Sequence, residues 1–319
     1  MADVANNSSS SAAVPASKRR RQLQPMSLFD EETVLEECAA LGIKAHHAYT
    51  MWRHLVQLGA ASVRDVPGLP KALYALAEEK FALTTSRVQS ASESRDGSTT
   101  KMVVVLQDGR LVECVIMRYG CVQLDSYPRD KLKTTADGDV VFRSTERATL
   151  CVSSQSGCQM GCTFCATGTM GLLANLTSGE ILEQLYHANR VTKIRGVVFM
   201  GMGEPLDNYA AVVTAIRGMT DVRRFSLSPT RVSVSTVGVA PRLRQLAHDC
   251  PGVSLALSLH APNQHLRSQI VPSSKVSPCA HVPCAHVQSC HQDISDNTLT
   301  GFVYRHGTLT ASWKPWTTL

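Results

Sequence analysis

Apolar residues recur at helical spacing in the first folded part of the chain. Three segments show this pattern, and they predict helices from Leu28 onward, over residues 45–58 and over residues 71–81. Proline and glycine at residues 66–70 make a sharp turn before the third helix. The pattern therefore predicts a small helical domain over residues 28–90.

Two short alternating segments follow this domain. Residues 101–106 and 110–117 flank Gln107-Asp108-Gly109, a combination that predicts a β-hairpin. Residues 90–100 are polar and are interpreted as a linker, and residues 119–145 are interpreted as an insertion. Residues 91–147 are thus expected to hold a linker, a hairpin and an insertion.

Short apolar runs alternate with longer helical patterns beyond residue 147. The predicted strands are residues 148–153, 196–200, 231–236 and 254–259. The predicted helices are residues 177–190, which open with a Thr177–Glu180 capping box, 209–219 and 241–249. Repeated strand–helix units are typical of a parallel sheet curled into part of a barrel, so an α/β barrel core is predicted over residues 148–275.

The first 27 residues are polar and contain a basic run, Lys18 to Arg21. Few apolar groups occur there, which predicts a disordered tail. The basic run fits a phosphate contact, a nuclear import signal or an ordinary charged tail. A Ser/Ala-rich segment almost free of acidic residues also fits a plastid transit peptide, so we expect a cytoplasmic protein with a plastid location as the alternative.

Composition excludes several other classes. The 319 residues are 44% hydrophobic and 18% charged, as in soluble globular proteins, and no apolar run reaches the roughly 20 residues of a membrane helix. Eleven cysteines in a long chain without a signal peptide favour a reducing compartment. The net charge of +6 is compatible with an RNA partner and equally with an ordinary solvated surface.

Three cysteines lie close together in the sequence at Cys158, Cys162 and Cys165. A cubane iron–sulfur cluster has four irons, and this C-x3-C-x2-C spacing supplies three thiolates, which leaves one iron open for another ligand. Buried structural cysteines, or a zinc site with a distant fourth ligand, are the alternatives. No second cysteine pair lies near this one, so the spacing favours iron–sulfur over zinc.

The spacing, with Phe164 before the last cysteine, resembles that of the radical S-adenosylmethionine (SAM) enzymes. The flanking segments narrow the resemblance to the RlmN family of RNA adenine-C2 methyltransferases. They are residues 148–155 (ATLCVSSQ), 200–206 (MGMGEPL), 232–239 (VSVSTVGV) and 257–263 (LSLHAPN). The resemblance extends from about residue 28 to about residue 274.

This resemblance implies a 4Fe-4S cluster whose open iron binds SAM. It implies a partial radical-SAM barrel behind a small helical accessory domain that contacts RNA. It also implies an electron donor of the flavodoxin or ferredoxin type and a monomer that acts on ribosomal RNA, tRNA or both. The SAM contacts that it implies are Gly203, Glu204, Ser235, Ser258, Leu259 and His260. Considered alone, Ser235 would be read as a satisfied strand serine and His260 as a capping histidine.

Two further residues gain a role only through the resemblance. Glu113 falls where the family has a proton acceptor, although by itself it reads as a solvent-facing strand carboxylate. Cys151 matches the cysteine that forms a disulfide with a methyl-carrying, C-terminal cysteine and so releases the methylated RNA. That route suits adenine C2, which is not nucleophilic and would resist polar methyl transfer.

The resemblance stops after residue 275. Residues 276–319 contain a direct repeat of Pro-Cys-Ala-His-Val, and Cys279, Cys284 and Cys290 do not stand in a family context. The repeat fits a metal site, but we favour an altered reading frame or a retained intron. We expect a disordered tail and a barrel with an open parallel edge, low stability and poor solubility. The alternative to an active methyltransferase is therefore an inactive cluster-binding fragment or isoform.

Overall fold

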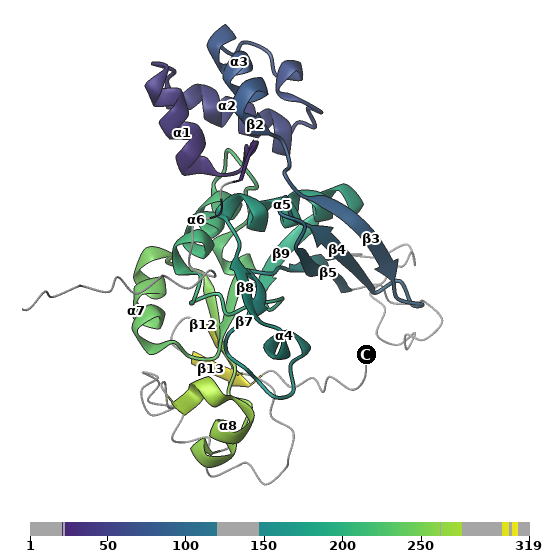
Figure 1. The fold of residues 1–319 in the computed structure, drawn as a ribbon, viewed down its shortest axis with the longest axis vertical. Helices are drawn as coiled ribbons and strands as arrows, with labels where there is room; N and C mark the ends of the chain where they lie inside the picture. The colour runs from purple at the N-terminus through teal and green to yellow at the C-terminus, as the bar shows by residue number, and fades with distance from the viewer. Residues whose placement is uncertain are drawn as a thin grey trace, which may run out of the picture.

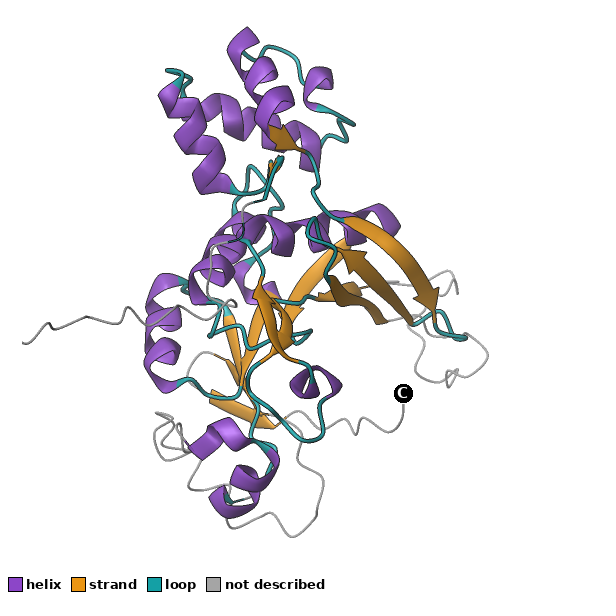
Figure 2. Cartoon of the chain, in the orientation of Figure 1, coloured by secondary structure: helices purple, strands orange, loops and turns teal. Residues whose placement is uncertain are grey.

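The computed structural model describes residues 21, 23–119, 147–261, 263–275, 302–305 and 308–311. A group of helices from the first part of the chain stands at one end of a long sheet, and the last helix lies at the other end (Figure 1). Helices cover the sheet along its middle strands (Figure 2). Within the described residues, no helix is long and apolar enough to cross a bilayer.

The three predicted helices of the first part are confirmed. They are α1 (Glu31–Ala40), α2 (Ala45–Val56) and α3 (Lys71–Lys80), with a 3-10 turn η2 (Val63–Asp65) between the last two. They pack around Trp52, which is fully buried and whose indole Nε1 donates to the Leu28 carbonyl over 2.6 Å. A two-stranded parallel pair, β1 (Met26–Ser27) with β2 (Phe81–Ala82), closes this unit.

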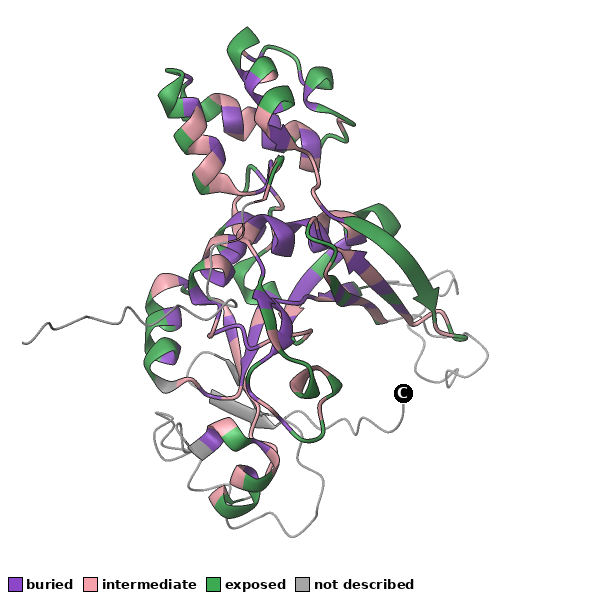
Figure 3. Cartoon of the chain, in the orientation of Figure 1, coloured by how far each residue is buried: buried purple, intermediate pink, exposed green. Residues whose placement is uncertain are grey.

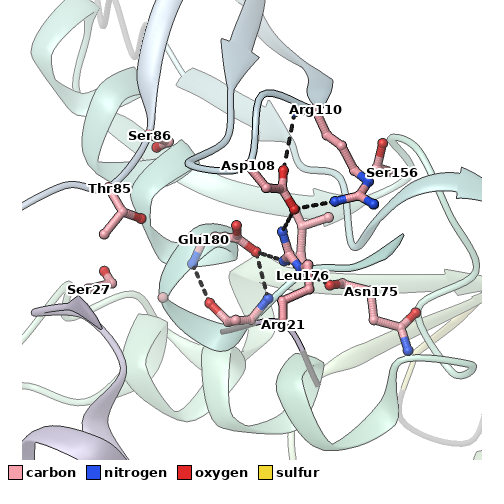
Figure 4. Close-up of polar contacts among 12 residues, drawn as sticks. Arg21, Ser27, Thr85, Ser86, Asp108, Arg110, Ser156, Asn175, Leu176 and Glu180 are labelled. Atoms are coloured by element: carbon pink, nitrogen blue, oxygen red, sulfur yellow. Dashed lines mark hydrogen bonds and ion pairs between the residues drawn. The ribbon is translucent and has the colours of Figure 1, made fainter. Parts of the chain in front are cut away.

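The end of the predicted disordered tail is ordered, which corrects that prediction for residues 21 and 23–27. Arg21 Nη1 donates to Asp108 Oδ2 over 2.6 Å, and its guanidinium also pairs with Glu180 (Figure 4). Glu180 has a fully buried side chain, so a cationic partner is needed there. The prediction failed because it counted apolar residues and the segment is held by charge. Residues 1–20 and 22 lie outside the described part.

One nine-stranded sheet joins the hairpin to the barrel strands, in the order β13-β12-β11-β10-β9-β6-β5-β4-β3. The first strands are β3 (Arg87–Glu93), β4 (Thr99–Val105), β5 (Leu111–Tyr119) and β6 (Arg147–Cys151). The next are β9 (Ile194–Phe199), β10 (Val232–Thr236) and β11 (Ser254–Leu257). Strands β6, β9, β10 and β11 are parallel, so the predicted α/β fold with a partial barrel is confirmed.

The interpretation of residues 90–100 as a linker is wrong. Most of that stretch belongs to β3, to the turn after it and to the start of β4. Every residue of β3 is exposed, so this strand lacks the alternation of apolar and polar residues that marks a half-buried strand. Residues 120–146, which include nearly all of the predicted insertion, lie outside the described part.

Helices from the second half of the chain cover the outer face of the parallel strands. They are α5 (Ser178–Val191), α6 (Tyr209–Thr220) and α7 (Ala240–Asp249). The Thr177–Glu180 capping box is present, since the Glu180 amide donates to Thr177 Oγ1 over 3.1 Å. The buried residues follow these helices and the strands beneath them (Figure 3).

The predicted open edge after the fourth parallel strand is also wrong. Strand β11 pairs antiparallel with β12 (Phe302–Arg305), which pairs with β13 (Thr308–Ala311). An edge strand has unpaired backbone N–H and C=O groups that can hydrogen-bond to any extended segment. Such pairing does not require apolar periodicity in the added segment. Disorder is therefore corrected for residues 302–305 and 308–311, whereas the repeat and its cysteines lie outside the described residues.

The helical unit is fastened to the barrel by Arg224, which follows α6 and has a fully buried side chain. Its Nη1 donates to Glu31 Oε2 over 2.9 Å, and its Nη2 donates to the Phe29 carbonyl over 3.0 Å. The guanidinium carbon also lies 4.6 Å from the centre of the Trp52 ring, a cation–π contact. One buried cation thus holds α1, α2 and the segment before them against the barrel.

Candidate functional site

The three cysteines lie on one loop at the carboxyl end of the parallel strands. This cluster loop, residues 155–175, consists of β7 (Gln155–Cys158), the short helix α4 (Ala166–Thr169) and β8 (Gly171–Asn175). Strand β7 pairs with β8, so the loop returns on itself and encloses the cysteines. A Cβ on Gly157, whose φ is +74°, would lie 1.9 Å from the Gly171 carbonyl oxygen, so only glycine fits this crossing.

Cys158 and Cys162 are buried, and Cys165 is half-buried. Burial raises the pKa of the Cys158 thiol to about 11, so a metal must be bound for the thiolate to persist at neutral pH. No three His, Cys, Asp or Glu side chains in the described residues converge on one metal ion. In a cubane cluster each thiolate binds a different iron.

The loop after β9 forms the second side of the site. Gly203 has a φ of +103°, and a Cβ there would lie 2.6 Å from the Cβ of Gln155. Gln155 is fully buried; its Oε1 accepts from the Glu204 amide over 2.8 Å, and its Nε2 donates to Asp207 Oδ2 over 3.0 Å. This glutamine therefore ties the start of the cluster loop to the loop that carries Glu204.

Glu204 is the buried carboxylate of the site, with 3% of the residue exposed. Its Oε1 accepts from the Leu206 amide over 3.0 Å, and its Oε2 accepts from the Val237 amide over 2.9 Å. Burial raises the pKa of Glu204, and these donors oppose the rise. The carboxylate thus lies at the predicted place beside the cysteines, held by backbone donors of two loops.

A cavity of about 170 Å³ lies between these loops and the cysteines. Its walls come from the cluster loop and from the loops after β9, β10 and β11. They are formed by Cys158, Met160, Cys162, Phe164, Cys165, Thr167, Phe199, Met200, Gly201, Gly203, Glu204, Ser235, Thr236, Val237, Ser258 and His260. The hydroxyls of Ser235 and Ser258 lie 3.2 Å apart. Leu259 is absent from these walls, and its carbonyl accepts from Arg267 instead.

His260 faces the cavity in a left-handed backbone conformation, with a φ of +63°. Its ring centre lies 5.0 Å from that of Phe164, across the cavity on the cluster loop. Burial, together with the charge of Arg267, lowers the pKa of His260 to about 4, so the ring is neutral at physiological pH. Its Nδ1 is buried without a hydrogen-bond partner. Native proteins seldom leave a buried polar atom unpaired, so a bound water or ligand is expected beside this nitrogen.

Cys151 is the last residue of β6, beside the cavity. The Met200 amide donates to its sulfur, and Met200 itself lines the cavity. Burial raises the pKa of the Cys151 thiol to about 11. The thiol is therefore protonated at neutral pH, and a base must remove its proton before it acts as a nucleophile.

Alkylation of Cys151 by iodoacetamide should rise about tenfold per pH unit between about pH 8 and pH 10, because only the thiolate reacts. Peptide mass spectrometry at fixed reagent concentration measures the rate. The same cysteine in the urea-unfolded chain is the matched reference, and it should be half-ionised near pH 8.5, as is usual for cysteine. Identical pH profiles in the folded and unfolded chains would contradict the buried environment.

Glu113 lies on the same face of the sheet as Cys151. Val115 of β5 stands directly opposite Cys151, and Glu113 is two residues further along β5, so the two are diagonal neighbours about 7–8 Å apart. Its side chain is 49% exposed and accepts from Lys101 Nζ over 3.1 Å. The structure therefore brings the two predicted catalytic residues together, with the carboxylate open to solvent.

Sequence reasoning missed three residues that hold the site together. Ser153 Oγ donates to the Glu113 carbonyl over 2.6 Å and accepts from the Met202 amide over 2.8 Å, which links β5 to the loop after β9. Gln155 and Arg267 likewise link other loops of the site through side-chain hydrogen bonds. Their only signal in the sequence is that they lie beside or within motif segments.

Comparisons with known proteins agree with this geometry. The family model of the radical SAM superfamily matches residues 152–275. The chain is 37% identical over 222 residues to "Ribosomal RNA large subunit methyltransferase N" of Nitrosopumilus maritimus, covering 66% of this chain and 57% of that protein. It is 36% identical over 265 residues to "Probable dual-specificity RNA methyltransferase RlmN" of Corynebacterium efficiens, covering 80% and 65%. The chain thus spans about three fifths of the length of these relatives.

A solved structure is similar over a larger share of its own length. The crystal structure of a radical SAM methyltransferase from Sphaerobacter thermophilus has a TM-score of 0.67 and is 33% identical, and the match covers 81% of this chain and 70% of that one.

Radical SAM proteins use a 4Fe-4S cluster and SAM, and the described residues fit both. The cysteines on the cluster loop supply three iron ligands. His260, Ser235 and Ser258 line the adjoining cavity, and their polar side chains suit a polar ligand. Fold, cysteine spacing and relatives agree: the chain belongs to the radical SAM methyltransferases, and its sequence is similar to the RlmN-named RNA methyltransferases.

Proposed function

We propose that this protein methylates carbon C2 of adenosine in ribosomal RNA, tRNA or both. The observation that carries the proposal is the position of Cys151, which lies next to the cavity and diagonal to Glu113 on one sheet face. The resemblance to the RlmN family gives a thiol in that position its role in product release. The printed names of the relatives support RNA as the substrate class.

The residues take the following roles in the proposal. Cys158, Cys162 and Cys165 hold three irons, while Gly203, Glu204, Ser235, Ser258 and His260 surround SAM. When bound, the cluster and SAM supply an electron, a carbon radical and the methyl group. Glu113 accepts the proton that leaves the RNA base. Cys151 would then form a disulfide with a second cysteine, whose sulfur is bonded to the base through the new methyl carbon; that carbon–sulfur bond breaks as the disulfide forms, the carbon takes up a proton, and the methylated RNA is released.

Partners and location are part of the proposal. A flavodoxin- or ferredoxin-type protein reduces the cluster, and the protein acts as a monomer. The helical unit, with its core around Trp52, contacts the RNA. We place the protein in the cytoplasm, with the plastid as the alternative.

A second candidate function follows from the sequence after residue 275, where no cysteine stands in a family context. In this second function the chain is an inactive isoform that binds the cluster without methylating RNA. The two candidate functions differ in whether 2-methyladenosine is formed. The chain is reconstituted anaerobically with iron and sulfide, then given SAM, a reductant and deproteinised RNA. Formation of both 5′-deoxyadenosine and 2-methyladenosine supports the methyltransferase, whereas deoxyadenosine alone supports the inactive isoform.

The Cys151→Ala variant tests the role of the thiol. We expect 2-methyladenosine to fall by about 10²-fold or more because product release loses its nucleophile, while 5′-deoxyadenosine stays within about twofold of wild type. Both nucleosides are quantified in one tube by liquid chromatography and mass spectrometry. Cys114→Ala is the matched control, since Cys114 is buried on the opposite face of the adjacent strand. Unchanged 2-methyladenosine in Cys151→Ala would refute the assignment.

A further inference from the structure

Helix α8 (Gln264–Ile270) lies between the two halves of the site, although no predicted function uses it. At its carboxyl end, the Ile270 carbonyl accepts from the Thr163 amide over 2.9 Å, on the cluster loop between two of the cysteines. Val271, directly after the helix, is fully buried in a cluster with Cys158 and Cys162. The helix therefore supports the cluster loop, which carries the three cysteines.

The other contact of α8 is with the SAM side of the cavity, through Arg267. This arginine is 1% exposed. Its Nε donates to the Leu259 carbonyl over 3.1 Å, and its Nη2 donates to the Val237 carbonyl. Leu259 directly precedes His260, and Val237 lines the cavity, so one guanidinium holds the loops after β10 and β11 together.

The backbone of Val237 is held from both sides. Its amide donates to Glu204 Oε2, and its carbonyl accepts from Arg267. The Leu259 carbonyl that Arg267 binds directly precedes His260, whose backbone is in the left-handed conformation. A planar guanidinium can bridge two carbonyls at fixed geometry, which a lysine ammonium does less well.

We propose that Arg267 is a positioning residue for the SAM side of the cavity: its guanidinium bridges the Leu259 and Val237 carbonyls and so fixes the loops after β10 and β11. The inference rests on the proposed function only in taking the cluster and SAM as cofactors. Its tests need no RNA, so its failure is distinguishable from a failure of RNA methylation.

The experiment compares Arg267→Gln and Arg267→Lys in the full reconstituted chain. Iron and sulfide analysis gives the cluster content, and equilibrium dialysis gives the Kd for SAM. We expect the cluster content to stay at the wild-type level in both variants, because neither substitution removes an iron ligand. The Kd for SAM should rise about tenfold in both, because the bridge between the two carbonyls is lost. Arg244→Gln, which removes an exposed arginine on α7, is the matched control and should change neither quantity.

Either of two results would overturn the proposal. A Kd for SAM within threefold of wild type in both variants would remove the positioning role. Loss of iron from both variants with an unchanged far-ultraviolet spectrum would show that Arg267 only supports the cluster loop, which also overturns the positioning role.

Discussion

Replacement of Cys162 by alanine is expected to reduce the iron retained after reconstitution from about four per chain to background, and to abolish formation of 5′-deoxyadenosine. The cluster loop offers three thiolates, and two cannot hold a cubane cluster. Iron and sulfide analysis and the absorbance of the cluster near 400 nm, about the usual region for such clusters, measure the loss.

The control is Cys250→Ala, which removes a buried cysteine at the end of α7, away from the cavity. It should retain wild-type iron. If Cys162→Ala kept most of its iron and sulfide, the ligand assignment would be wrong. Zinc without sulfide in the wild-type chain would restore the zinc alternative.

The second large effect concerns stability and not chemistry. Arg224→Ala is expected to lower the free energy of unfolding by about 3–5 kcal/mol, because a buried cation, its carboxylate partner and its aromatic contact are broken together. Urea denaturation followed by tryptophan fluorescence is suitable, since Trp52 lies against the lost guanidinium. Burial lowers the pKa of Arg224, and Glu31 opposes that shift, so the pair already bears a desolvation cost.

The neighbouring arginine provides the control. Arg223 has a half-exposed side chain, pairs with Asp221 over 2.6 Å and lies 3.5 Å from the ring centre of Tyr49. Exposed pairs contribute little, so Arg223→Ala should cost less than about 1 kcal/mol. Equal losses for the two substitutions would mean that the buried contacts of Arg224 do not fasten the helical unit.

Much of the fold was readable from periodicity. Helices α1, α2, α3, α5, α6 and α7 and the four parallel strands all carry the apolar spacing of half-buried elements. Elements without that spacing were not predicted from the sequence. Strand β3 is exposed throughout, and α8 has only seven residues between two motif segments. Arg21 is ordered by two carboxylates that lie far away in the sequence, which no local pattern records.

The candidate site was predictable to the extent that chemistry depends on spacing. Three cysteines in eight residues identify a metal loop without any structure. The opposition of Val115 and Cys151, by contrast, depends on strand register. The bridge from Arg267 to Leu259 and Val237 depends on how three loops meet. Such contacts arise only in the folded chain. The resemblance to a family identified the motifs around these residues but not the contacts themselves.

Strand β5 ends and β6 begins at Tyr119 and Arg147, which are paired directly across the sheet. The connection between them leaves and re-enters the fold at adjacent positions. For such a connection, doubling its length adds only about 0.6 kcal/mol of closure entropy. Added residues between Tyr119 and Arg147 would therefore cost little free energy of folding, and the strand pairing would keep Glu113 and Cys151 aligned. This makes the connection a suitable place to attach a fluorescent or affinity module.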